Sequence, residues 1–257
     1  MLSAMRTALI AALCLAVATN AELSAQKKDS DKKPTATKPL KPPKDDAKSA
    51  KDKVIRAIDK FTKSKVNTKP KTWRTRMPAP PEQKFDPEQQ YLWHVDTSVG
   101  ALVVTLLPEA APKHVTSVIY LSRCGFYDGL ELPRVLKGFM AQGGSPTNDQ
   151  AGNAGYSMDG EFLTKQKHDK PGALSAANSG PGTDGSQFFL TFVPTPHLDG
   201  LHTVHGFVTV GSETLKAIEA LGVEKDGAPL SEKVTILCTW ITVVDAPKAK
   251  EPAADGK

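Results

Sequence analysis

The chemistry-bearing residues of this sequence begin with an arginine that has no reactive neighbour. Arg134 lies near the start of PRVLKGFMAQGG, residues 133–144. The apolar pair Phe139 and Met140 follows it, and then Gln142. The stretch supplies no nucleophile, metal ligand or carboxylate. A guanidinium beside a dry apolar surface can stabilise charge that develops in a bound molecule, so the stretch predicts a site that works without making a covalent bond.

Other catalytic patterns are missing or incomplete. No GK[ST] follows the glycine-rich GGSPTNDQAGNAG, residues 143–155, so the sequence predicts a surface loop there and not a phosphate loop. No GxSxG is present, so a serine hydrolase of that type would lack its nucleophile. The histidine-rich stretch HLDGLHTVH, residues 197–205, lacks the order of an HExxH metal site. We therefore expect neither a metal nor another cofactor.

Three further motifs accompany the arginine stretch. They are FYDG at 126–129, ALSAANSGPGTDGSQFFLT at 173–191 and HLDGLHTVHGFV at 197–208. Together and in this order, the four motifs closely resemble the cyclophilins, a family of peptidyl-prolyl isomerases. The resemblance covers about residues 90–245 and leaves the N-terminal third of the chain unmatched. It implies an isomerase domain over 90–245 that acts on proline-containing polypeptides.

The resemblance also implies a role for each residue of the site. Turning an X-Pro bond means crossing a barrier of about 18 to 20 kcal/mol that arises from amide resonance, and no bond has to be broken. Cyclophilins use an arginine in this motif as a donor to the prolyl nitrogen, so the expected catalytic residues are Arg134 and Gln142, which would hold the substrate backbone. The implied substrate-binding residues are Phe139, Met140, Phe189 and Leu198 at the floor of a proline pocket, Ala177 and Asn178 along the groove, and His197 and His202 at the rim.

The sequence departs from the family pattern at several positions. His197 stands where many cyclophilins have tryptophan, and Pro133 stands where histidine commonly precedes the arginine. Ser145 replaces a frequent aspartate, and His205 replaces a phenylalanine. Losing the tryptophan removes apolar area at the rim but leaves the arginine and the floor in place. We expect this change to weaken cyclosporin binding more than turnover.

The elements that must position these residues are short strands and two helices. Residues 91–107 alternate as a hairpin, and the β-branched run at 233–244 predicts a buried closing strand. Helices are predicted within 108–125 and over 212–222, the second with Ser212 as its N-cap. These elements predict a mainly β fold, a closed antiparallel barrel capped by two α-helices. The resemblance implies eight strands.

Strand parity sets a requirement on the arginine stretch. Arg134, Met140 and Gln142 share a face only if one strand runs through them, and Phe139 then points the other way. A local bend at residues 137–138, Lys-Gly, would bring Phe139 to the same site.

The first residues of the chain have a different composition. Residues 1–25 resemble a secretory signal peptide, because Arg6 precedes an apolar run over 8–18 and small residues suit cleavage after Ala21 or Ala25. The apolar run is shorter than the roughly 20 residues that a membrane-spanning helix needs. We therefore expect an exported, bacterial-like form of the enzyme, either periplasmic or secreted.

Three further segments flank the domain. Residues 26–53 are rich in Lys, Asp and Pro with one large apolar residue, Leu40, and predict a disordered linker. Residues 54–89 begin with VIRAIDKF, which predicts a short amphipathic helix, and continue as a proline-broken lead-in. Packing of this helix on the domain is favoured over contact with lipid. A disordered tail is expected over 246–257.

Charge is distributed unevenly along the chain. Residues 26–76 hold 18 Lys and Arg against 6 Asp and Glu, a net of +12, whereas residues 77–257 hold 14 against 21, a net of −7. A nucleic-acid reader would carry positive charge on its folded domain, so nucleic acid is disfavoured as a partner. The basic segment predicts instead a possible contact with an anionic envelope surface.

Two hypotheses about function remain. The first is an isomerase that assists the folding of exported proteins, and the second is a cyclophilin-shaped binding module or chaperone with little turnover. The retained Arg134 and Gln142 favour the enzyme, which we expect to be a monomer. The sequence leaves open whether Cys124 and Cys238 form a disulfide or remain two buried thiols.

Overall fold

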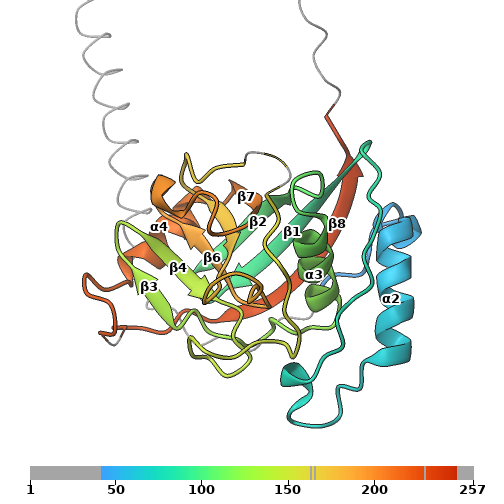
Figure 1. Ribbon diagram of the computed structural model, residues 1–257, viewed down its shortest axis with the longest axis horizontal. Helices are drawn as coiled ribbons and strands as arrows, with labels where there is room; N and C mark the ends of the chain where they lie inside the picture. The colour runs from blue at the N-terminus through green and yellow to red at the C-terminus, as the bar shows by residue number, and fades with distance from the viewer. Residues whose placement is uncertain (1–41, 163, 165, 229, 248–257) are drawn as a thin grey trace, which may run out of the picture. The chain divides into compact units, whose positions relative to one another are not determined.

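The computed structural model describes residues 42–162, 164, 166–228 and 230–247, and an eight-stranded sheet lies at its centre (Figure 1). The strands follow the order β3-β4-β6-β5-β7-β2-β1-β8, and every neighbouring pair is antiparallel. In chain order they are β1 Gln89–Thr97, β2 Gly100–Leu106, β3 Arg134–Leu136, β4 Met140–Gly143, β5 Ala173–Ala176, β6 Phe188–Thr191, β7 Val204–Val210 and β8 Ile236–Asp245.

The predicted closure of the barrel is incomplete, which corrects the sequence-based expectation. Within the part of the chain that the structure describes, no ladder joins the edge strands β3 and β8. The segments just before them meet instead, through a bridge between Glu131 and Thr235 and a 2.9 Å hydrogen bond from Leu132 N to Val234 O. Pro133 follows at once and has no N–H to continue the pairing. The sheet therefore stays open between β3 and β8.

The predicted β1–β2 hairpin is confirmed. Thr97 pairs with Gly100 across a two-residue turn, and the pairing continues to Leu92 opposite Thr105. The buried side chains alternate along both strands and form the apolar centre of the sheet. Trp93 is fully buried there, with its ring edge-on to the ring of Phe188 at 5.2 Å. Among the strands that the structure describes, β8 pairs only with β1. Its first four residues are all buried, and buried positions alternate after them.

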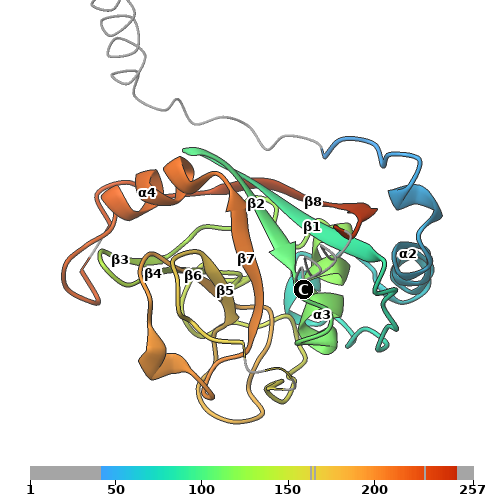
Figure 2. The ribbon, with the colours of Figure 1, turned by 90° about the horizontal axis from the view of Figure 1, so that it is seen from above.

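Two helices cover opposite ends of the sheet (Figure 2). They are α3, Pro112–Arg123, which contacts β8, and α4, Ser212–Ala220, which contacts β2, β3 and β4. Proline at the first position of α3 suits the helix start, because its missing N–H has no partner there in any case. Gly125, with φ of 65°, ends this helix as predicted.

The predicted N-cap of α4 is wrong by one residue. Gly211, with φ of 93°, is the N-cap, and Ser212 is the first residue of the helix with no capping hydrogen bond from its side chain. A Cβ at position 211 would lie 2.3 Å from the carbonyl oxygen of Ala101. The close approach of two backbones therefore places glycine at the cap and moves serine into the helix.

The segment before the sheet is folded against it. Its elements are the 3-10 helix η1, Ser49–Lys51, the helix α2, Lys53–Lys65, and the 3-10 helix η2, Trp73–Thr75. Asp52 caps α2 by accepting a hydrogen bond from Ile55 N at 2.9 Å. Val54, Ile55 and Ile58 are buried, and α2 contacts α3 (Figures 1 and 2). The end of the predicted linker is thus ordered: Ser49 is fully buried and donates to Asp46.

Several predicted segments lie outside the described residues. They are the signal peptide over 1–25, the first part of the linker and most of the C-terminal tail. Among the helices that the structure describes, none combines the length and the apolar composition needed to span a bilayer. Cys124 and Cys238 are both free thiols.

Candidate active site

The hairpin of β3 and β4 positions the two expected catalytic residues. Arg134 lies directly opposite Gln142 in the register, and Leu136 lies opposite Met140. The chain therefore reverses between these residues, which corrects the expectation of one strand with a local bend. Gly138, with φ of 66°, occupies the turn, where a left-handed backbone suits glycine.

The guanidinium of Arg134 is held by a carboxylate from a distant loop. Its Nε donates to both oxygens of Asp226 at 2.9 and 3.1 Å, and its Nη2 donates to one of them at 2.5 Å. The hydrogen bonds from Arg134 lower the pKa of Asp226, so this carboxylate is charged at neutral pH. The remaining nitrogen, Nη1, donates to Oε1 of Gln142 at 3.2 Å. A two-pronged ion pair thus fixes the plane of the guanidinium.

A cavity of about 270 Å³ lies beside this guanidinium. It is lined by nine of the ten residues predicted for the site. These are Arg134, Phe139, Met140, Gln142, Ala177, Asn178, Phe189, Leu198 and His202.

Phe189 forms the floor of this cavity together with side chains from both sides. It lies on β6 opposite Gln142, and His202 meets its ring edge-on at 5.3 Å. On the far side His168 stacks on the ring at 5.9 Å. His168 is fully buried between Asp199 and Ser175, both within 2.9 Å of its ring nitrogens. Sequence reasoning missed His168, because its contact with Phe189 arises only when β5 and β6 pair.

His197 is the predicted residue that does not line the cavity. It lies exposed in the 3-10 helix η3, Pro196–Leu198, with its ring stacked on Phe139 at 5.7 Å. It therefore contacts a residue that lines the cavity, Phe139, but does not line the cavity itself. At the rim of the cavity, Nδ1 of His202 lies 2.9 Å from the carbonyl oxygen of Ala176 and donates to it.

The side chain of Asn178 joins two loops at the edge of the cavity. Its amide nitrogen donates to Asp184 at 2.7 Å and to the carbonyl oxygen of Leu201 at 3.1 Å. Its oxygen accepts a hydrogen bond from Gly180 N. Both amide hydrogens are engaged within the protein, so the main chain at this position is left to bind a peptide.

A buried charge cluster lies behind Asn178. His114 contacts Glu161 through Nδ1 at 2.7 Å and Asp184 through Nε2 at 2.8 Å, and all three side chains are at most 7% exposed. Both ring nitrogens face carboxylates, so both donate and the ring is an imidazolium. Burial lowers the pKa of His114, but the two carboxylates raise it further, so the net shift is upward. His205 lies 5.5 Å from this ring, and burial together with the charge of His114 lowers its pKa to about 3.

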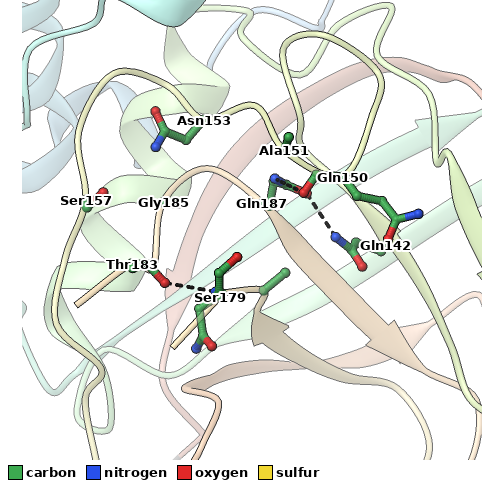
Figure 3. Close-up of a pocket in the computed structure, with 11 residues that line it drawn as sticks. Gln142, Gln150, Ala151, Asn153, Ser157, Ser179, Thr183, Gly185 and Gln187 are labelled. Atoms are coloured by element: carbon green, nitrogen blue, oxygen red, sulfur yellow. Dashed lines mark hydrogen bonds between the residues drawn. The ribbon is translucent and has the colours of Figure 1, made fainter. Parts of the chain in front are cut away.

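A second pocket of about 260 Å³ adjoins the first and shares Gln142, Ala177 and Asn178 with it. Nε2 of Gln142 donates to Oε1 of Gln187 at 2.9 Å, and Gln187 donates in turn to the carbonyl oxygens of Gln150 and Gly152. Figure 3 shows these glutamines meeting at one end of the pocket. The rest of the lining is neutral: Gln150, Ala151, Asn153, Ser157, Ser179, Thr183 and Gly185.

Comparison with known proteins decides the family. The sequence profile described as "Cyclophilin type peptidyl-prolyl cis-trans isomerase/CLD" matches residues 92–240, more than half of the chain. This chain belongs to the cyclophilin family. The match includes the whole β sheet apart from residues 89–91 of β1 and 241–245 of β8, and it excludes α2 and η2.

Relatives of this cyclophilin occur in several eukaryotes. "Peptidyl-prolyl cis-trans isomerase-like 2" of Cryptococcus neoformans is 44% identical over 161 residues, which cover 60% of this chain and 27% of that protein. The chain thus spans about a quarter of the length of the first relatives it matches. "Peptidyl-prolyl cis-trans isomerase CYP18-2" of Arabidopsis thaliana is 38% identical over 150 residues, 57% of this chain and 91% of that protein.

Solved cyclophilin structures share the fold. A cyclophilin type isomerase of Cryptosporidium parvum matches with a TM-score of 0.56 and 29% identity, over 62% of this chain and 99% of that one. The same parasite protein in the presence of the dipeptide Ala-Pro matches with a TM-score of 0.56 and 30% identity, over 58% of this chain and 98% of that one. The relatives named here are eukaryotic, so they lend no support to a bacterial-like form.

Proposed function

We propose that this cyclophilin is exported and catalyses cis/trans isomerisation of X-Pro bonds in proteins that fold outside the cytoplasm. One observation carries the catalytic part of this proposal. The guanidinium of Arg134 and the ring of Phe189 line the same cavity. A charged donor beside an apolar floor is what a reaction without covalent chemistry needs.

The reaction follows from the electronic structure of the amide. Twisting the X-Pro bond removes amide resonance and localises the lone pair on the prolyl nitrogen. Arg134 donates to this nitrogen while the pyrrolidine ring rests on Phe189 and Met140. The planar states offer no such acceptor, so the hydrogen bond stabilises the transition state without tightening the binding of substrate.

The arrangement around Arg134 favours this role. Asp226 holds the guanidinium in place, and Gln142 accepts from its inner nitrogen. A donor that is already oriented needs little reorganisation when the bond twists. The peptide then lies extended along the main chain at 177–178 and continues toward the second pocket, which shares this wall with the first.

The segments outside the described residues complete the proposal. Residues 1–25 direct export, and the basic residues of the linker attract an anionic envelope surface. The substrates are proline-containing polypeptides, which a monomer suffices to bind.

Substitution of Arg134 tests the catalytic step. For Arg134→Ala we expect kcat/KM on a short Xaa-Pro peptide to fall about a hundredfold, as is typical when a transition-state donor is removed. A protease-coupled assay or NMR exchange measures the rate. Arg56→Ala, at an exposed position of α2, is the matched control and should keep the wild-type rate.

The alternative is a module that binds extended proline segments with little turnover. The apolar lining of the first pocket and the neutral lining of the second would serve binding as well as catalysis. Equal rates for the wild type and Arg134→Ala would favour this module and remove the enzymatic proposal.

A further inference from the structure

The segment that precedes the family match touches the loop that walls the second pocket. Met77 is buried, and its N–H donates to the carbonyl oxygen of Ala154 at 2.8 Å. Gly155 packs so closely on this segment that a Cβ there would lie 2.8 Å from Thr75 O, 3.0 Å from the Cα of Arg76 and 3.1 Å from Met77 N. All three neighbours are backbone atoms, which cannot swing away as a side chain can.

The preceding segment is itself fixed to the domain on both sides of this contact. The ring of Trp73 meets Phe126 edge-on at 6.2 Å, and Arg74 donates to the carbonyl oxygen of Asp128 at 2.7 Å. On the other side, the hydroxyl of Tyr120 donates to the carbonyl oxygen of Pro78 at 3.1 Å. Residues 73–78 therefore form a rigid strap against the domain and not a loose tether.

The opposite face of the same loop forms the pocket. Ala151, Asn153 and Ser157 line it (Figure 3), and the buried Ala154 lies between two of these positions. From the pocket side, Gln187 holds the loop through the carbonyl oxygens of Gln150 and Gly152. The loop is thus fixed from within by a side chain and from outside by the strap.

We propose that residues 73–78, outside the cyclophilin match, set the shape of the second pocket and so determine which substrate side chain it accepts. This inference rests on the proposed function, because it assigns the second pocket to the substrate chain that flanks the proline. Among the residues that the structure describes, the lining carries no charged side chain, so the accepted residue is neutral and hydrogen-bonding, such as Ser, Thr, Asn or Gln. A charged residue would enter the pocket without an ion-pair partner.

Substitution of two glycines tests this inference. Gly155→Ala inserts a methyl group into the contact with the strap and should displace the loop from it. Gly129→Ala is the matched control, because Gly129 also has a left-handed backbone, with φ of 80° against 100° at Gly155, but a Cβ there would meet nothing within 4 Å. Both variants carry similar backbone strain, and only one carries the clash.

Two substrates distinguish an effect on the second pocket from an effect on the proline pocket. One is a short Xaa-Pro peptide that reaches only the proline pocket, and the other is a longer peptide with a neutral polar residue placed to enter the second pocket. For Gly155→Ala we expect KM for the longer peptide to rise about fivefold, while kcat/KM for the short peptide stays within about twofold of the wild type. Gly129→Ala should keep the wild-type preference between the two peptides.

Each outcome has one meaning. If Gly155→Ala and Gly129→Ala discriminate between the peptides as the wild type does, the strap does not determine specificity and the inference is overturned. A fall of equal size on both peptides also overturns it, since that is the mark of a general loss of structure. Failure of the wild type to turn over the short peptide would instead remove the proposed function.

Discussion

At the scale of single residues, the contact between Arg134 and Asp226 decides how the site can work. The carboxylate binds the guanidinium through Nε and Nη2 and leaves Nη1 on the side of Gln142. Asp226 lies more than 90 residues away in the chain and is half exposed. We expect its contribution to be one of position, because it holds the guanidinium without being among the residues that line the cavity.

Substitution of Asp226 should reveal this positioning. Exposed ion pairs contribute up to about 1 kcal/mol, so we expect Asp226→Asn to lower kcat/KM by about fivefold, far less than Arg134→Ala. The loss should appear in kcat more than in KM, because the oriented donor acts in the twisted state. Steady-state kinetics measure both constants, with the exposed Glu109→Gln as a control of the same chemical change. A loss confined to KM would contradict the positioning role.

Most residues that line the candidate site could be predicted from the sequence, but the residues that hold them in place could not. Motif resemblance identified the nine cavity residues, because they lie within short stretches of ordered sequence. His168, Asp184 and Asp226 were missed, since each acts through a contact with a residue far from it in the chain. His197 was expected at the cavity, but its position in η3 directs it to Phe139.

At the scale of elements, a buried cluster ties helix, loop and sheet together behind the groove. His114 lies in α3, its carboxylate partners Glu161 and Asp184 lie in two loops, and His205 lies in β7. The shifts act in opposite directions with pH. Because the pKa of His114 is raised in the fold, its contribution to stability is complete at low pH and is lost as pH rises. The pKa values of Glu161 and Asp184 are lowered, so their contribution is present above about pH 4 and is lost as pH falls.

His205 makes this balance measurable. It stays neutral in the fold down to about pH 3, while the unfolded chain takes up its proton near pH 6.5. Its contribution to stability is therefore complete above pH 6.5 and is lost as pH falls. As the pH is lowered from 7 to 5, we expect the unfolding free energy of the wild type to fall by on the order of 2 kcal/mol more than that of His205→Phe.

Chemical denaturation at the two pH values measures this difference. The comparison isolates the titration of His205, because the lost hydrogen bond to Thr203 O costs the same at both. His197→Phe, at an exposed ring, is the control for the change of residue type. An unchanged difference between variant and wild type would contradict a neutral buried His205.

The elements themselves were predictable where they obey local rules. The hairpin of β1 and β2 follows from alternation, and the end of α3 follows from Gly125. Closure of the sheet was not predictable, because it depends on how Pro133 ends a pairing between segments a hundred residues apart. The cap of α4 was misplaced for a similar reason, since Ala101 lies on another strand.

At the scale of the whole molecule, two regions of the chain carry opposite net charge. The net charge is +12 over residues 26–76 and −7 over residues 77–257. Two basic side chains of the first region contact the domain: Arg74 donates to the carbonyl oxygen of Asp128, and Lys48 forms an ion pair with Asp245. The lysines of 26–41 lie outside the described residues and carry the proposed attraction to an anionic surface.

The N-terminal segments give one prediction for the full chain. Expressed whole, the protein should be recovered outside the cytoplasm with a mature N-terminus at Glu22 or Gln26, as measured by mass spectrometry. This mature form should bind anionic vesicles in a salt-sensitive way, and removal of residues 26–41 should abolish the binding. An uncleaved chain would contradict export, and binding that survives the removal would contradict the role of these lysines.

The row of side chains from Asp226 through Arg134, Gln142 and Gln187 to the carbonyl of Gly152 joins the two halves of the groove. We expect a ligand amide that displaces Gln187 to change the orientation of the Gln142 side chain beside the guanidinium. If binding of this amide changes the affinity of the guanidinium for the prolyl group, binding of the prolyl group changes the affinity for the amide by the same factor. We therefore expect two substrates with identical Xaa-Pro pairs but different flanking residues to bind with different affinity.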